Sequence, residues 1–308
     1  MTMTGLPKDR IRRLAGMTAH LPLADDYALL KSVALSPVQR DRIAWAVRHY
    51  LWVSLASYFP ARNFALAEDL LERYAADVAA LPNITPNGLV LPKRENFLAF
   101  NEVHSTVVEA FESLGLARSV ERIHAPINVR LVSGVPDAKV DNRPRASTKP
   151  HSDMWAGEPA AAIMLFISVL GDPRDAGVRF IEPASFPEAL MHPLPDFNDG
   201  HSILEGAREY EARLAPDKVF LTDPFLIHQT MKSGKGQRLS IDFRFTPTEK
   251  VASDRYDGVS RQANYITLEE WREIGRTRLI KSDAPLAPFT GGNGVKDGYA
   301  AEFPIVPL

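Results

Sequence analysis

The segment Arg238-Leu239-Ser240-Ile241-Asp242-Phe243-Arg244-Phe245 alternates strictly between polar and apolar residues. Successive side chains of a β-strand point to opposite faces, so this pattern predicts a strand with one polar and one apolar face. We expect the apolar face to pack beneath helices and the polar face to turn into a cavity. The rest of the chain must then supply a layer of helices on one side of this strand and further strands around the cavity.

Strands of the required kind precede this segment. Residues 127–132 alternate apolar with polar residues, and residues 162–170 are almost all apolar, as expected of a strand buried on both faces. Several short strands separated by turn residues are typical of a sandwich or a barrel. The remaining predicted strands cover residues 177–181, 218–221 and 225–230 and the segment that contains His151.

Helices are predicted before the strands. Ser36-Pro37 is typical of a helix N-terminus, and an apolar stripe of helical period follows it to Phe59. Similar stripes predict two more helices, over residues 64–81 and 94–116, and residues 1–35 are expected to form an arm with a short helix. The first part of the chain, residues 1–125, is therefore predicted to be mainly helical.

Two further segments flank the predicted strands. Residues 185–214 begin as a Pro-rich loop and continue with a charged stretch over 205–213 that we expect to be helical. An insertion of this kind at a barrel mouth would act as a lid over a site. Residues 247–308 form an extension with a capping box at Thr267-Leu268-Glu269-Glu270, where a helix to about residue 275 is expected, and residues 285–308 are expected to be extended.

Composition narrows the class of protein. The chain has 308 residues, of which 45% are hydrophobic, and we expect one domain over residues 1–308. The net charge of −2 gives no electrostatic reason to expect nucleic acid or an anionic membrane as a partner. The absence of cysteine excludes disulfides, thiolate metal sites and cysteine nucleophiles, so a metal would need histidine and carboxylate ligands. No signal peptide or membrane span is apparent, so a cytoplasmic location is expected.

The histidines and carboxylates of the strand region suggest such a metal site. His151 and Asp153 lie two residues apart on a predicted extended segment and should share a face. His228, in an apolar stretch farther along the chain, can supply a third ligand if its strand lies opposite. Two imidazoles and one carboxylate suit a non-haem Fe(II) centre with open positions. Arg238 and Ser240, on the polar face of the last strand, form a seat for a carboxylate.

Together these residues resemble the Fe(II)/2-oxoglutarate-dependent oxygenases. His151-Ser152-Asp153, His228 and Arg238-Leu239-Ser240 match the His-X-Asp, distal His and Arg-X-Ser motifs of that superfamily, with the arginine ten residues after the distal histidine. The resemblance covers about residues 125–246, and the segment 177–183 is similar to the phytanoyl-CoA-hydroxylase-like branch. A Pro-Gly-Ser-His element common in that branch is replaced here by residues 182–185. Because the carboxylate of Asp153 is present, the related halogenases are disfavoured.

The resemblance implies a fold and a reaction. It implies an α+β fold in which a double-stranded β-helix (jelly-roll, cupin-like barrel) over residues 126–246 is flanked by the amino-terminal helices. It implies that His151, Asp153 and His228 bind Fe(II), and that Arg238 and Ser240 hold the far carboxylate of the cosubstrate 2-oxoglutarate. With O2, such an enzyme releases succinate and CO2 and most often hydroxylates an unactivated carbon. Desaturation, cyclisation and epimerisation would use the same ligands.

Several assignments and alternatives stay open. We expect a small polar metabolite or natural-product intermediate as the substrate, with Trp155, Arg145 and Lys149 as candidate contacts, and a homodimer is compatible with the sequence. One alternative function is a cupin-like metal-dependent isomerase or hydrolase that does not use 2-oxoglutarate, and another is a non-catalytic barrel. Structural roles are expected for six further residues: Asn128 and Arg130 near the site, Asp242 and Arg244 as an ion pair, and His192 and His201 on the surface. Glu158 is expected to be a solvated loop charge.

Overall fold

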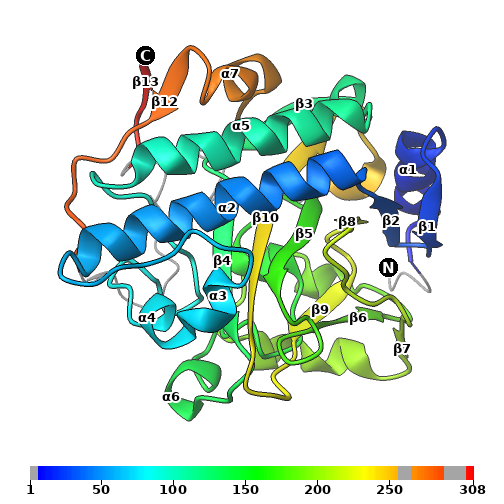
Figure 1. Cartoon of the computed structure of the whole chain (residues 1–308). Helices are drawn as coiled ribbons and strands as arrows, with labels where there is room; N and C mark the ends of the chain where they lie inside the picture. Colours follow the sequence, from blue (N-terminus) through cyan, green and yellow to red (C-terminus); the bar gives the residue numbers. More distant parts are fainter. Residues whose placement is uncertain (1–5, 256–264, 288–302) are drawn as a thin grey trace.

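The computed structural model describes residues 6–255, 265–287 and 303–308. Helices lie on one side of a large antiparallel sheet, and a smaller antiparallel sheet completes the strand region (Figure 1). The helices are α1 (Lys8–Thr18), α2 (Pro37–Tyr58), α3 (Leu70–Arg73), α4 (Ala75–Ala79), α5 (Phe97–Ser113), α6 (Ala138–Asp141) and α7 (Leu268–Glu273). The strands are β1 (Leu23–Asp26), β2 (Leu30–Ala34), β3 (Val120–His124), β4 (Asn128–Ser133), β5 (Ile163–Gly171), β6 (Val178–Glu182), β7 (Arg208–Glu209), β8 (Lys218–Thr222), β9 (Ile227–Thr230), β10 (Gln237–Pro247), β11 (Tyr265–Thr267), β12 (Arg278–Ile280) and β13 (Ile305–Pro307).

Strand β10, which contains the alternating segment, lies in the middle of the large sheet. It pairs with β5 along one edge, and along the other edge with β4 and then with β3. Strands β8, β2 and β1 follow beyond β5, and β11 follows beyond β3. The predicted strands in residues 126–246 are confirmed, except at His151. The sheet also takes in β1, β2, β3 and β11, which lie outside that range.

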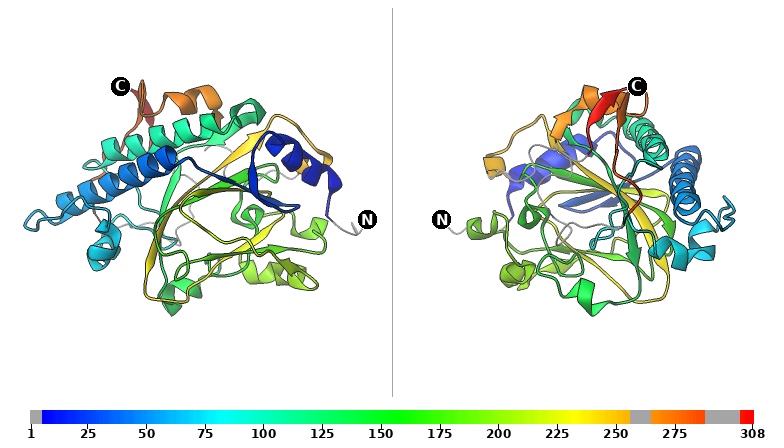
Figure 2. Two further views of the ribbon diagram at one scale, coloured as in Figure 1. Left: turned by 45° about the vertical axis from the view of Figure 1, so that its right-hand side comes forward. Right: turned by 90° about the vertical axis from the view of Figure 1, so that its left-hand side faces the viewer.

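The apolar face of β10 packs beneath helices, as the alternation predicts. Leu239, Ile241, Phe243 and Phe245 are all fully buried. Helices α2 and α5 run side by side across this face (Figures 1 and 2). The ring of Phe111 in α5 lies edge-on to Phe243 and Phe245, with centroids 5.8 and 5.7 Å apart. The polar face of β10 is thereby left to face away from the helices.

Strands of the small sheet alternate along the chain with strands of the large sheet. Its order is β7-β6-β9, and an isolated bridge between His151 and His228 adds one more pairing next to β9. Along the chain, β4, β5, β8 and β10 belong to the large sheet, whereas the bridge residue His151 and strands β6, β7 and β9 belong to the small one. The chain therefore passes repeatedly between two sheets.

Two long predicted helices are confirmed as α2 and α5, and neighbouring residues explain where α2 begins. The Ser36 side chain accepts a hydrogen bond from the Gln39 amide, and the Gln39 side chain accepts one from the Ser36 amide, so a capping box starts α2. The expected helix at 94–116 is α5. The Thr267 capping box likewise starts α7. In the carboxy-terminal extension, residues 288–302 lie outside the described part of the chain, and β13 pairs with β12.

The prediction of one helix over residues 64–81 is wrong. Only α3 and α4 form there, and Tyr74 interrupts them with φ −114° and ψ 28°. Side chains use the backbone at the start of this stretch, because Trp52 Nε1 donates to the carbonyl of Phe64 at 2.8 Å and the amide of Ala65 donates to the Tyr74 hydroxyl at 3.0 Å. Those tertiary hydrogen bonds replace the helical ones.

The predictions for residues 205–213 and 1–35 also need correction. The charged stretch is not a helix: Gly206 has φ +69°, β7 pairs with the edge of β6, and the Tyr210 amide donates to the Phe180 carbonyl at 2.8 Å. The amino-terminal arm contains the expected helix, α1, but then forms the β1-β2 hairpin, which pairs with β8. None of the described helices has both the length and the apolar character needed to cross a bilayer.

Candidate metal centre

Three side chains meet where the two sheets face one cavity. The ligand atoms of His151, Asp153 and His228 all lie within 4.8 Å of one another. The His151 amide donates to the His228 carbonyl at 3.0 Å and the His228 amide donates to the His151 carbonyl at 2.9 Å, so the two backbone segments are held side by side. The imidazole centroids are 4.3 Å apart. The structure therefore brings together the three residues that the sequence suggested as ligands.

Asp153 lies in a different secondary-structure element from the one predicted. The His151 segment makes one bridge and not a strand, and Asp153 opens a short 3-10 helix, Asp153–Ala156. Ser152 is extended (φ −93°, ψ 147°), and its Oγ donates to the Pro224 carbonyl at 2.6 Å and accepts from the Met154 amide at 3.2 Å. One extended residue is enough to put His151 and Asp153 on the same side.

The histidines are held in the form that binds metals. His151 Nδ1 donates to the Lys149 carbonyl at 2.8 Å, which leaves Nε2 for an ion. The ring of Phe197 stacks on His151, with centroids 4.5 Å apart and an interplanar angle of 1°. Burial and the neighbouring His228 lower the pKa of His151 to about 3, and burial also lowers the pKa of His228. Neutral imidazoles can coordinate a metal without first losing a proton.

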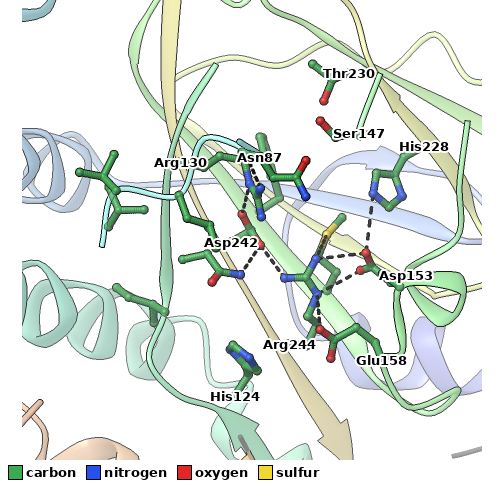
Figure 3. A pocket seen from close by; sticks show the side chains of 18 of the residues that line it. Asn87, His124, Arg130, Ser147, Asp153, Glu158, His228, Thr230, Asp242 and Arg244 are labelled. Carbon is green, nitrogen blue, oxygen red and sulfur yellow. Dashed lines mark hydrogen bonds and ion pairs between the residues drawn. The ribbon is translucent and has the colours of Figure 1, made fainter. Parts of the chain in front are cut away.

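Asp153 is ionised because an arginine faces it. Arg244 Nε donates to Oδ2 and Arg244 Nη2 to Oδ1, each at 3.1 Å, and His228 Nε2 lies 3.8 Å from Oδ1. Burial alone would raise the pKa of Asp153, but Arg244 and His228 outweigh it and bring the pKa to about 2. Figure 3 shows this pairing beside His228. Sequence reasoning missed this role of Arg244.

Asp242 links Arg244 to the neighbouring strand β4. Arg244 Nη1 donates to the Asp242 carboxylate, so the expected pair is confirmed. Arg130 Nε donates to the same carboxylate at 3.1 Å and Asn128 Nδ2 at 2.8 Å. The only sequence signal for this network was that Asp242 and Arg244 share the polar face of β10. It makes the wall of the site rigid and keeps its charges paired (Figure 3).

Arg238 is the exception to this pairing. It is 1% exposed, and among the described residues neither its Nε nor its Nη1 has a hydrogen-bond partner. Its guanidinium lies over the Phe166 ring, 5.1 Å from the centroid. Burial, reinforced by Arg130 and opposed by Asp242, lowers the pKa of Arg238 to about 9. Because an unpaired buried charge is costly, this guanidinium is suited to receive an anion.

The candidate metal ligands and Arg238 line one cavity of about 130 Å³. Ser240, the next residue on the same face of β10, is fully buried, and its Oγ has no partner within the described chain. It does not itself line the cavity. Glu158, which we expected to be solvated, is buried in the cavity wall and accepts a hydrogen bond from the Tyr265 hydroxyl at 2.8 Å.

Of the three candidate substrate contacts, only Arg145 lines the cavity. Trp155 is fully buried and donates from Nε1 to the Leu190 carbonyl at 2.9 Å, so its predicted contact role is replaced by packing. Lys149 is absent from the cavity wall and pairs with Asp196 at 2.8 Å. The lid-like segment 185–214 contributes Phe197 to the wall. It also contributes buried core residues, Phe186, Met191 and Leu194, and is therefore part of the packed structure.

No protein-family model matches this sequence, and no curated protein matches it. Solved structures to which this chain is similar include the non-haem α-ketoglutarate-dependent carbocyclase SnoK from nogalamycin biosynthesis, 12% identical, with 99% of this chain and 98% of that chain covered and a TM-score of 0.43. An N-substituted L-amino acid dioxygenase from Burkholderia ambifaria is 14% identical over 76% of this chain and 86% of that one, with a TM-score of 0.38. EctD from S. alaskensis, solved with 2-oxoglutarate and 5-hydroxyectoine, is 14% identical over 74% of each chain, with a TM-score of 0.37. The chemistry of the site is therefore inferred from its own residues.

Proposed function

We propose that this protein is a non-haem Fe(II)- and 2-oxoglutarate-dependent oxygenase. One observation carries the proposal: a His-Asp-His set, buried at His151 and Asp153 and partly exposed at His228, and a buried arginine without a partner among the described residues open into the same cavity. A metal-dependent isomerase or hydrolase of the cupin type needs the three ligands but does not need a carboxylate-bearing cosubstrate. Arg238 therefore favours an enzyme that binds a carboxylate-bearing cosubstrate.

The strand order supports the double-stranded β-helix that the sequence resemblance implies. In such a jelly-roll fold, eight strands alternate between two sheets that enclose the site. Here β4, β10, β5 and β8 are neighbours in one sheet, and His151, β9, β6 and β7 are neighbours in the other. The metal ligands come from the small sheet and its edge, whereas the arginine comes from the large sheet.

The donor set fits an Fe(II) ion. His151, Asp153 and His228 would provide two nitrogens and one oxygen from one side, which leaves coordination positions open toward the cavity. When bound, Fe(II) and 2-oxoglutarate would supply the oxidising chemistry: O2 is consumed, 2-oxoglutarate becomes succinate and CO2, and one oxygen atom enters the substrate. The outcome expected here is hydroxylation of a small polar molecule.

The chain's own residues position and shield these groups. Arg238 would hold the far carboxylate of 2-oxoglutarate, because guanidinium and carboxylate match as a bidentate pair. The Ser240 hydroxyl, expected to take part, lies behind the cavity wall and not in it. Arg244 holds Asp153 in place through the two bonds described above. Leu91, Phe166 and Phe180 form apolar parts of the wall and limit the access of water to the reacting groups.

Anaerobic titration with Fe(II), followed by 2-oxoglutarate, tests the proposal. Chelation of the 2-oxo acid at an open Fe(II) site should produce a weak visible charge-transfer band. His228→Gln should lose the band because Fe(II) binding fails. Arg238→Gln should bind Fe(II) but need roughly 10- to 100-fold more 2-oxoglutarate, the range expected for one charge-assisted interaction.

Either of two results would reject the proposal. One is a folded wild-type protein that binds Fe(II) but gives no band with 2-oxoglutarate. The other is equal 2-oxoglutarate affinity in wild type and Arg238→Gln. The first would favour the cupin-like isomerase or hydrolase, and the second would remove Arg238, the residue on which the choice of 2-oxoglutarate depends. An exposed arginine, Arg174, serves as the matched control, since its side chain is 88% exposed and pairs with Asp172 on the surface.

A further inference from the structure

Most charged side chains of the described cavity wall have an oppositely charged partner in the same wall. Among the described residues, four arginines and three carboxylates line the cavity: Arg130, Arg145, Arg238, Arg244, Asp153, Glu158 and Asp242. Arg130 is bonded to one carboxylate, and Arg244 contacts all three, the farthest at 4.0 Å. In the proposed function, the unpaired Arg238 receives the far carboxylate of 2-oxoglutarate. One arginine of the wall is then left without a carboxylate.

That arginine is Arg145. Its one hydrogen bond within the described chain runs from Nε to the Leu194 carbonyl at 2.7 Å, and no carboxylate of the described residues lies within ion-pair distance. The carbonyl fixes the position of the guanidinium but does not neutralise it. A divalent metal and a doubly charged 2-oxoglutarate add no net charge to the cavity, so the described part of the wall still carries one positive charge after both have bound.

Two hydroxyl groups accompany Arg145 in the wall. Ser147 is two residues farther along the same segment, and the amide of Thr230 donates to the Ser147 carbonyl at 2.8 Å, so these residues are neighbours. Neither hydroxyl is hydrogen-bonded within the described part of the chain. Figure 3 shows them together on the side of the cavity that holds His228. Thr230 lies two residues after that ligand on β9 and therefore on the same face.

The surroundings of these polar groups are apolar. Val178 and Phe180 of β6, which pairs with β9, line the cavity, as does Phe197, whose ring stacks on His151. A ligand that satisfies the arginine must therefore also place an apolar body against these side chains. A small carboxylic acid has both parts, and its planar carboxylate matches the guanidinium better than a neutral group does.

We infer that the primary substrate is a small carboxylic acid with an apolar body, and that Arg145, Ser147 and Thr230 bind its carboxylate beside the metal centre. The inference rests on the proposed function, because that function assigns Arg238 to 2-oxoglutarate. It adds the substrate class and the residues that select it. Arg145 acts in binding, and the apolar wall directs the rest of the acid toward the open metal positions.

Binding of matched acids and amides tests the inference. Protein loaded anaerobically with Fe(II) and saturating 2-oxoglutarate is titrated calorimetrically with phenylacetate and hexanoate, and with their neutral isosteres phenylacetamide and hexanamide. At least one acid should bind about 10- to 100-fold more tightly than its amide. Arg145→Gln should remove this preference by weakening the acid and leaving the amide unchanged, Arg145→Lys should keep part of it, and Arg174→Gln should keep all of it.

Two results would overturn the inference: no acid binds wild type more tightly than its amide, or Arg145→Gln retains the preference. The charge-transfer band separates this failure from failure of the proposed function, because Arg145→Gln should form the band normally. If wild type forms no band, the proposed function is wrong. The acids and amides are then compared on metal-free Arg238→Gln protein, where Arg145 is the remaining unpaired arginine of the wall.

Discussion

Replacing Arg10 with methionine tests whether the amino-terminal helix holds the metal centre together. Arg10 of α1 is fully buried, and its Nε donates to both carboxylate oxygens of Asp223 at 3.0 Å, while Nη1 donates to Asp254 at 2.9 Å. Asp223 begins the turn that leads into β9, and the next residue, Pro224, accepts the hydrogen bond from Ser152. The helix is therefore connected to the segments that carry His228 and Asp153.

The expected loss of stability follows from what remains after the substitution. Asp223 would stay 1% exposed, with the amide of Phe225 at 2.9 Å as its remaining hydrogen-bond donor. Removing one partner of a buried ion pair costs about 3–5 kcal/mol, a large part of a typical unfolding free energy of ~5–15 kcal/mol. The melting temperature of this 308-residue chain should fall by roughly 5–8 °C. The double variant Arg10→Met/Asp223→Asn should recover most of the loss, because it also removes the unpaired charge.

Urea unfolding of the metal-free protein measures these free energies, and anaerobic Fe(II) titration measures the effect on the site, where weaker binding is expected. Arg12→Met is the matched control, because Arg12 is exposed on the same helix and should change stability by less than about 0.5 kcal/mol. Equal stability of Arg10→Met and Arg12→Met would refute the reasoning. So would a double variant as unstable as Arg10→Met alone, since the loss would then not come from the unpaired carboxylate.

Three further predictions concern the core. Burial, opposed by a hydrogen bond to the Trp271 backbone, lowers the pKa of His104 to about 4. As the pH drops from about 6.5 to 4, this histidine takes up a proton in the unfolded chain before it does so in the folded one, so the free energy of unfolding falls by up to ~1.4 kcal/mol per pH unit. In urea unfolding, His104→Gln should show a shallower pH dependence than wild type, and parallel curves would contradict this. Gly200→Ala should lower the melting temperature, because a Cβ there would lie 2.3 Å from the buried Trp155 ring, and an unchanged melting temperature would show that the contact relaxes freely. Phe243→Ala should lower the free energy of unfolding by about 3–5 kcal/mol, whereas Leu98→Ala, at a 63% exposed position, should stay within about 0.5 kcal/mol of wild type; equal losses would contradict the assignment of the core.

The sequence predicted most of the elements whose signals are local. The alternation of β10, the Ser36-Pro37 start of α2, the capping box of α7 and the long apolar run of β5 each depend on residues close together in the chain, and each prediction is confirmed. The two failed helix predictions have the opposite character. Residues 64–81 and 205–213 carry helix-compatible patterns, but distant side chains and the edge of β6 bind their backbones instead.

The candidate ligands were also identified from the sequence, because His-X-Asp spacing on extended backbone and the alternation of β10 are properties of neighbouring residues. Only the tertiary structure could show that Arg244 pairs with Asp153, that Trp155 is buried in packing, and that Arg238 and Arg145 have no carboxylate partner among the described residues. Whether a charge is paired depends on which distant strands lie side by side, and the pairing of strands far apart in sequence is decided by packing of the whole chain. Local spacing in the sequence therefore points to the residues that can act, whereas the packing of distant strands leaves Arg238 and Arg145 without a carboxylate among the described residues and able to bind a ligand.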